Sequence, residues 1–193
     1  MQFSYFFDII NLVIFMKVLA IIFDGFEELE ATAPFALIRR AGINLTIASN
    51  KTTVTGGHNI SYTNIDILDD INYKEYDALL LPGGPHYKTL QTNKLVHEII
   101  TYFMTNKKIV AAICAAPTII GQLGLLKDRT YTCFTPMNDD FGGNFNNVPV
   151  VVDDNLITGR SAAASIDFAY AIIEKVAGTS VLNKVWERIF YEK

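Results

Sequence analysis

The residue best suited to covalent chemistry is Cys114, in the segment Ala-Ala-Ile-Cys-Ala-Ala-Pro. It follows an apolar run at 109–113 that has the length of a buried strand, and it precedes a helix predicted over 115–126. A strand-to-helix turn exposes its side chain above the sheet, and the N–H groups that open the helix favour an anion there. We therefore predict a nucleophilic thiol with a lowered pKa, in preference to the inert buried cysteine common in protein cores.

Glu30 is the second candidate, in a helix predicted from Glu27 to a stop at Ala41-Gly42. Glu27 and Glu30 are three residues apart and share a helix face, whereas Glu28 points elsewhere. All three carboxyl groups would complement the helix dipole, and Glu30 also lies deeper among apolar neighbours. A carboxyl group beside a thiolate could stay protonated and donate a hydrogen bond to the sulfur. Spacing alone leaves open whether Glu30 does this or only stabilises the helix.

Backbone donors come from the turn Leu-Pro-Gly-Gly-Pro at 81–85, which ends a strand predicted over 76–81. Gly83 and Gly84 allow the backbone to approach a ligand closely, and their N–H groups could form an oxyanion hole. The turn matches neither G-x-G-x-x-G nor a P-loop, so it gives a dinucleotide site little support.

The remaining polar residues indicate neither a metal centre nor a second nucleophile. His58, His86 and His97 lack the spacing of metal ligands, and the sequence has no G-x-S-x-G elbow. Cys133 ends a predicted strand, which favours a role in core packing. Arg160 follows the last strand and is either a surface charge or an anion-binding group. We expect no metal and no cofactor.

The candidate residues lie on alternating strands and helices. Strands are predicted over 18–23, 44–48, 76–81, 108–113 and 130–134, helices over 27–40, 90–106, 115–126, 165–176 and 182–191, and hairpins over 52–57 and 149–158. Such alternation predicts an α/β fold, a mostly parallel sheet with helices on both faces. These folds bind ligands at the carboxyl ends of their strands, where Gly83, Gly84 and Cys114 are expected.

The composition is that of one globular domain. The chain has 193 residues, of which 50% are hydrophobic, so it has ample material for a core. Its 16 basic and 20 acidic residues give a net charge of −4, which argues against a nucleic-acid partner. Two cysteines cannot form a disulfide framework, so we expect a cytoplasmic protein.

Residues 1–15 form an apolar extension before the domain predicted over 16–193. Asp8 and Lys17 interrupt the apolar run, leaving it shorter than the roughly 20 residues that a membrane-spanning helix needs. A signal peptide fits poorly because the segment lacks a basic start and a small-residue cleavage site. The alternatives are an added N-terminal helix and a start assigned too early. We favour Met16 as the natural start, and we expect no membrane contact.

Five segments in order along the chain carry a family resemblance. They are residues 22–30 (IFDGFEELE), 39–42 (RRAG), 77–84 (DALLLPGG), 111–117 (AAICAAP) and 166–169 (IDFA). Together they resemble the ThiJ/PfpI superfamily, in the branch of the parkinsonism-associated deglycase and its bacterial relatives. The resemblance implies a single flavodoxin-like domain, similar to class I glutamine amidotransferases, and usually a homodimer.

The resemblance also implies roles for individual residues. The family's nucleophilic, oxidation-sensitive cysteine falls on Cys114, and its protonated glutamate, hydrogen-bonded to that sulfur, falls on Glu30. The glycine that contributes a backbone N–H near the sulfur falls on Gly83 or Gly84. We expect the N–H of Ala115 to assist it.

Substrate contacts are expected from Pro117, His58 and Arg160, and here the sequence departs from the family. His58 stands where relatives carry an arginine from the partner subunit, and Thr135 stands where human-like members carry a histidine. Ala115 directly follows the cysteine and no histidine occurs after residue 97, so a Cys–His protease or glutamine amidotransferase is not expected.

Two functions fit this site equally well. The first is a cofactor-independent glyoxalase or deglycase in which Cys114 adds to a small 2-oxoaldehyde or a glycated substrate and Glu30 moves a proton. The second is an oxidative-stress sensor or redox-regulated chaperone that uses oxidation of the same cysteine. A dimeric scaffold with an incidental reactive thiol is a third alternative.

Overall fold

The fold was examined in a computed structural model, which describes residues 16–191; the predicted extension at 1–15 lies outside the described residues. The strands of the main sheet are β1 (Lys17–Ile21), β2 (Asn44–Ser49), β5 (Asp66–Ile67), β6 (Ala78–Leu81), β7 (Ile109–Ile113), β10 (Val150–Asp153) and β11 (Leu156–Gly159). Two small ladders join β3 (Thr53–Thr55) to β4 (Ser61–Thr63) and β8 (Thr130–Tyr131) to β9 (Asn144–Phe145). The helices are α2 (Glu28–Arg40), α3 (Tyr87–Leu90), α4 (Lys94–Thr105), α5 (Ala116–Gln122), α6 (Ser165–Ala177) and α7 (Thr179–Ile189).

The main sheet is mostly parallel, which confirms the predicted flavodoxin-like α/β fold. Its strand order is β10-β11-β7-β6-β1-β2-β5, and only the β10–β11 pair is antiparallel. The chain passes from β1 to β2 on one side and returns to β6 on the other. The carboxyl ends of β1, β6 and β7 therefore lie along one edge, where folds of this kind place their ligands.

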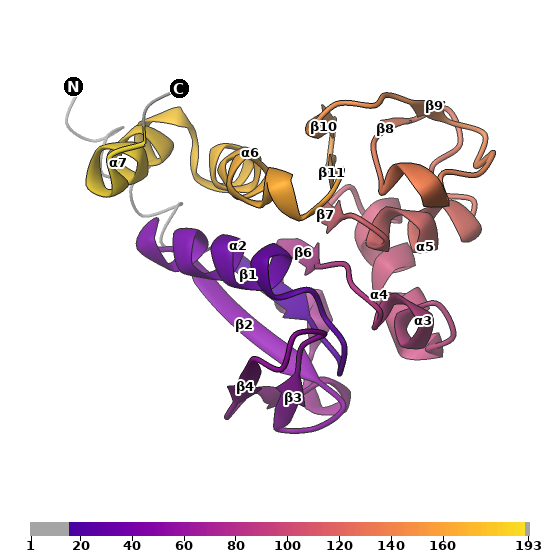
Figure 1. Cartoon of the computed structure of the whole chain (residues 1–193), viewed down its shortest axis with the longest axis horizontal. Helices are drawn as coiled ribbons and strands as arrows, with labels where there is room; N and C mark the ends of the chain where they lie inside the picture. The colour runs from indigo at the N-terminus through magenta and orange to yellow at the C-terminus, as the bar shows by residue number, and fades with distance from the viewer. Residues whose placement is uncertain (1–15, 192–193) are drawn as a thin grey trace.

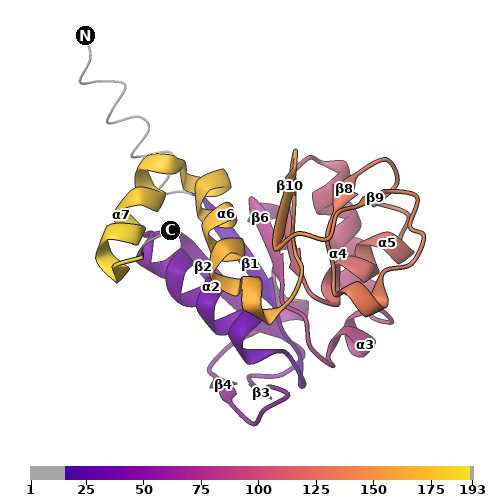
Figure 2. The same cartoon turned by 45° about the horizontal axis from the view of Figure 1, so that its top comes forward.

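Helices cover both faces of the sheet (Figures 1 and 2). On one face, α2 and α6 lie side by side with α7 beyond them, and they bury one apolar cluster against the strands. On the other face, α4 and α5 enclose a second cluster. Strands β6 and β7 are buried along their whole length, as expected of central strands covered on both sides.

The structure corrects several predicted elements. The helix predicted over 115–126 ends at Gln122, and the helix predicted over 182–191 begins at Thr179. The helix predicted over 90–106 begins later, as α4 at Lys94, because the Asn93 side chain accepts the Val96 N–H at 3.1 Å and caps its first turn. The strand predicted over 130–134 shortens to β8, which pairs with β9 outside the main sheet. Cys133, just beyond β8, lies fully buried in the apolar core, as predicted.

Helix α2 begins and ends where its sequence predicts. The Glu27 side chain accepts the backbone N–H of Glu30 at 2.7 Å, which caps the first turn. Pro34 lies inside the helix without ending it, and the chain leaves through Gly42, whose φ of +79° suits a glycine. The cap fixes the turn on which Glu30 is carried.

Among residues 16–191, no helix has both the length and the apolar character needed to cross a bilayer.

Removal of an aromatic ring from the core should strongly lower the free energy of unfolding. Phe168 on α6 is fully buried, so Phe168→Ala is expected to lower the free energy of unfolding by about 3–5 kcal/mol. Phe190, 92% exposed, is the matched control, and Phe190→Ala should change it by less than about 1 kcal/mol. Urea unfolding measures both. Equal losses in the two variants would contradict this assignment of the core.

Candidate active site

Cys114 lies at the carboxyl end of β7, on a strained turn before α5. Its φ is 62°, a left-handed conformation that costs a non-glycine residue roughly 1–3 kcal/mol. Two backbone hydrogen bonds hold this conformation: the Cys114 N–H donates to Gly159 at 2.9 Å, and the Phe134 N–H donates to the Cys114 carbonyl at 2.8 Å. The side chain is half-buried, so its sulfur remains open to a reagent.

Glu30 brings a carboxyl group to the same place from α2. Its side chain is fully buried, and Oε2 accepts the Gly83 N–H at 2.8 Å. The other oxygen, Oε1, has no hydrogen bond of standard geometry among residues 16–191. The thiol of Cys114 is the neighbouring side chain that interacts with this carboxyl. Glu30 and Cys114 are far apart in the sequence, and the structure brings their side chains together.

Gly83 leaves the space in which the two side chains meet. A Cβ at this position would lie 2.5 Å from Glu30 Oε2 and 2.7 Å from Cys114 Cβ, closer than real atoms approach. Any side chain here would separate the carboxyl from the thiol. The N–H of Gly83 donates to Glu30, which leaves Gly84 as the one of the two candidate glycines whose N–H is free to act on the sulfur.

Gly84 and Ala115 supply the backbone donors instead. The N–H groups of both residues act on the Cys114 sulfur and lower its pKa. Gly84 has a φ of 98°, and a Cβ there would lie 2.4 Å from the Glu27 nitrogen, so the turn requires glycine. Two of the three predicted backbone donors therefore surround the sulfur.

The pKa of the Cys114 thiol is raised, whereas the sequence predicts a lowered value. Burial raises the pKa of Cys114, and the negative charge of Glu30 raises it further, against the opposing effect of the backbone donors. Burial also raises the pKa of Glu30, to about 7. Both groups cannot be ionised at once near neutral pH, so the pair holds at least one proton between them.

A cavity of about 300 Å³ opens beside the thiol. Its lining comes from the turn after β6, the start of α5 and the segment after β8, and consists of Gly84, Pro85, Tyr87, Lys88, Cys114, Ala115, Phe134 and Met137. Apart from the thiol, the lining carries few polar side-chain groups. A small molecule in this cavity would meet the sulfur directly.

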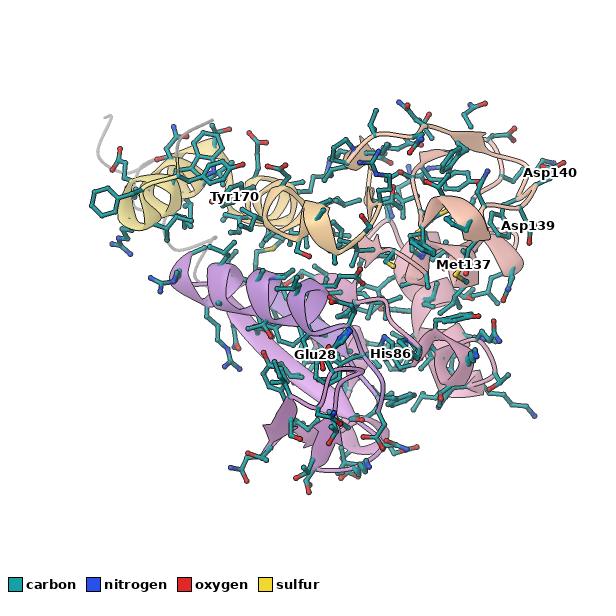
Figure 3. All side chains as sticks on the ribbon, in the orientation of Figure 1. Glu28, His86, Met137, Asp139, Asp140 and Tyr170 are labelled. Atoms are coloured by element: carbon teal, nitrogen blue, oxygen red, sulfur yellow. The ribbon has the colours of Figure 1, made fainter. Side chains whose placement is uncertain are left out.

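The predicted substrate contacts lie outside this lining. Pro117 is buried in the first turn of α5, and the Arg160 guanidinium binds Asn147, with one hydrogen bond of 3.2 Å to its Oδ1. The ring of His58 hydrogen-bonds to the buried carboxyl of Glu28, with 2.8 Å between Nδ1 and Oε2. Figure 3 shows Glu28 between α2 and the β3–β4 hairpin. His58 thus secures the loop before β4.

His86 is a structural residue for which the sequence alone predicts no role. It is buried, its Nδ1 accepts the Phe23 N–H at 3.1 Å, and its Nε2–H donates to the Pro82 carbonyl at 2.8 Å. Burial lowers the pKa of His86 to about 4, so the ring is neutral near pH 7. It ties the Gly83–Gly84 turn to the end of β1. Its position in the sequence, directly after Gly-Gly-Pro, was the one indication that His86 supports the glycine turn.

One group of side chains within residues 16–191 has metal-ligand geometry. Ligand atoms of Glu27, Glu28 and His58 lie within 4.8 Å of one another. Their oxygens and nitrogen already serve other contacts: Glu27 caps the helix at Glu30, and Glu28 binds His58. The three side chains therefore stabilise the start of α2, and these contacts explain why they lie together.

The fold is an α/β fold of flavodoxin-like topology. Its site consists of a cysteine on a strand-to-helix turn and a buried carboxyl beside it, which defines a class of α/β proteins with a cysteine–carboxyl site. The chain belongs to the DJ-1/PfpI family, whose profile matches residues 16–175. The resemblance to the ThiJ/PfpI superfamily is therefore confirmed.

Individual relatives agree with this assignment. Deglycase TK1284 of Thermococcus kodakarensis is 36% identical over 151 residues, covering 75% of this chain and 90% of that protein. Protein dj-1beta of Drosophila melanogaster is 30% identical over 177 residues, covering 86% and 92%. The crystal structure of Drosophila DJ-1beta superposes with a TM-score of 0.86 at 27% identity, covering 92% of this chain and 99% of that chain.

The raised pKa of Glu30 makes a prediction about stability. The pKa of the Glu30 carboxyl is higher in the folded protein, at about 7, than its ordinary value of 4.5. The folded state therefore has its full stability below pH 4.5, where the carboxyl is protonated in both states, and loses stability as the pH rises through about 7. Near pH 8, Glu30→Gln should therefore raise the free energy of unfolding, by up to about 3 kcal/mol, and the gain should shrink toward pH 5.

Glu28→Gln is the matched control on the same helix. Burial acts to raise the pKa of Glu28, but hydrogen bonds from the His58 side chain and backbone outweigh it and lower that pKa overall. Glu28→Gln should accordingly destabilise the protein near pH 8. Thermal unfolding at both pH values tests the pair, and destabilisation by Glu30→Gln at both would refute the proposed cost of the buried charge.

Proposed function

We propose that the protein is a cofactor-independent glyoxalase of the deglycase type, acting on small 2-oxoaldehydes through Cys114 and Glu30. The observation that carries this proposal is the buried Glu30 carboxyl, with a pKa of about 7, beside a thiol that lines a cavity. A base with a pKa close to the working pH transfers protons most effectively. The names of the relatives from Thermococcus kodakarensis and Pyrococcus furiosus, both deglycases, support the same chemistry.

The first step joins the sulfur to the aldehyde. The Glu30 carboxylate accepts the thiol proton while the Cys114 sulfur forms a bond to the aldehyde carbon. The electron pair of the carbonyl moves to its oxygen, which the N–H groups of Gly84 and Ala115 are placed to stabilise. Protonation of that oxygen by Glu30 gives a neutral hemithioacetal and returns the carboxylate.

The second step moves hydrogen along the substrate. Glu30 removes the proton from the carbon bonded to sulfur, and the electron pair shifts to the neighbouring carbonyl oxygen to give an enediolate. The protonated Glu30 then delivers this proton to the second carbon, and the hydroxyl proton of the first carbon passes to the oxygen on the second, which leaves a thioester of a 2-hydroxy acid. One carbon is oxidised and the other reduced, so no external redox agent is needed. Water then hydrolyses the thioester and releases the thiol.

A glycated amine or thiol is a second form of substrate for the same site. In its adduct the former aldehyde carbon carries a hydroxyl and the amine or thiol. When the bond to the amine or thiol breaks, the hydroxyl proton passes to the leaving group and the aldehyde is regenerated, which then enters the first step. The deglycase names of the relatives favour including this reaction in the proposal.

Turnover of methylglyoxal to lactate tests the proposed reaction. Cys114→Ser and Glu30→Gln should each lower kcat/KM by at least about 100-fold, because each removes a group that handles a proton or a bond. Cys133→Ser is the matched control: its thiol is buried in the core, and burial raises its pKa to about 11, so turnover should persist.

The same experiment separates the proposal from the redox alternative. Full turnover by Cys114→Ser or Glu30→Gln would refute the enzyme mechanism. A wild-type protein that turns over nothing, but whose Cys114 is converted to a sulfinate by mild peroxide, would instead be an oxidation sensor. The Glu30 carboxyl would then stabilise the oxidised sulfur by a hydrogen bond.

We propose further that the protein forms a homodimer, as the family resemblance implies, and that it is cytoplasmic, as its two cysteines favour. Leu29 on α2 and Ile166 on α6 are large apolar side chains that are 61% and 43% exposed, and their helices lie side by side. Such a surface is suited to a second copy of the chain. Light scattering should give twice the mass of the chain, and Leu29→Asp should lower it; a monomeric wild type would contradict this.

A further inference from the structure

Beside the sulfur, the cavity has an apolar wall that the proposed reaction does not use. Phe134 and Met137 line one side, and Tyr87 also borders the cavity. Phe134 is 40% exposed, although Cys133 directly before it is fully buried. A single exposed phenylalanine is ordinary on a protein surface, but here it joins two further apolar side chains around one opening.

The wall is held in register with the reactive residue. The Phe134 N–H donates to the Cys114 carbonyl at 2.8 Å, so the two backbones are joined directly. The Met137 N–H donates to the Phe134 carbonyl at 2.8 Å and closes the short helical turn Thr135–Met137. Figure 3 labels Met137 on this segment, next to α5. A group bonded to the sulfur would therefore meet a surface in a fixed position.

The size of the cavity exceeds the needs of the smallest aldehydes. Pockets that enclose drug-sized ligands begin at about 300 Å³, which is the volume here. Methylglyoxal carries only a methyl group beyond its two carbonyls and would leave most of this space filled with water. A larger apolar substituent would displace that water and cover the wall.

Charge does not favour an anionic substituent. Lys88 is the one charged side chain in the cavity lining, and it is exposed at the rim. An exposed ammonium group remains hydrated and contributes little to a single ion pair.

We infer that this site selects 2-oxoaldehydes, free or as glycation adducts, whose substituent is aromatic or bulky and apolar, with Phe134 and Met137 as the residues that determine specificity. The inference rests on the proposed function for its chemistry and on the wall for its selectivity. The reacting end of the substrate lies at Cys114, and its substituent covers the two apolar side chains.

Kinetics with two probes test the inference. The wild type should have a higher kcat/KM for phenylglyoxal than for methylglyoxal, and Phe134→Ala or Met137→Ala should lower the ratio of the two values by about tenfold or more. Phe190→Ala, an exposed phenylalanine outside the cavity, should leave the ratio unchanged. A wild type that prefers methylglyoxal, or a ratio unaffected by both cavity variants, would overturn the inference.

A second measurement keeps the test independent of turnover. Cys114 is alkylated in the Cys133→Ser background with iodoacetamide and with N-phenyl iodoacetamide, and the ratio of rates is compared with that of free cysteine. The wall should raise the ratio for the phenyl reagent, and Phe134→Ala should remove the increase. If no aldehyde is turned over but this ratio is raised, the proposed function fails and the selectivity stands. A ratio equal to that of free cysteine refutes the selectivity.

Discussion

The carboxyl group of Glu30 is removed from water beside the thiol of Cys114, with the Gly83 N–H at 2.8 Å as its backbone donor. An ionised carboxylate is costly in such a place, so its pKa rises to about 7 and its proton is available near neutral pH. The same charge raises the pKa of the neighbouring thiol. In the proposed mechanism, proton transfer between the two groups therefore replaces a permanently ionised cysteine, and the surrounding structure keeps the two side chains together.

Three features of the fold keep Glu30 and Cys114 in position. Each of them either lowers the stability of the fold or limits which residues its position can carry. The Glu27 cap fixes the first turn of α2, and His86 anchors the glycine turn through the Pro82 carbonyl. Cys114 keeps a left-handed backbone conformation. Strain and buried charge of this kind gather at sites where function, rather than stability, is selected. The central strands β6 and β7, buried on both faces, provide the rigid support that this strain requires.

Much of this arrangement could be predicted from the sequence, because it depends on local patterns. The apolar run before Cys114 indicates the strand, and the order of strands and helices indicates the parallel sheet. Contacts between distant segments could not be predicted in this way. The assignment of the Gly83 N–H to Glu30 and the hydrogen bond from Phe134 to Cys114 join residues of different elements. The direction of the thiol pKa also depends on burial, which spacing does not reveal.

Infrared spectroscopy can measure directly whether the buried Glu30 carboxyl keeps its proton near neutral pH. The difference between the spectra of the wild type and Glu30→Gln isolates the band of the protonated carboxyl, which can be followed as the pH is raised. This band should disappear with a midpoint near 7, as the raised pKa of Glu30 requires. The midpoint should change in Cys114→Ala, since the two groups interact. A midpoint at the ordinary glutamate value of 4.5, unchanged by loss of the thiol, would show that Glu30 is not a buried carboxyl coupled to Cys114.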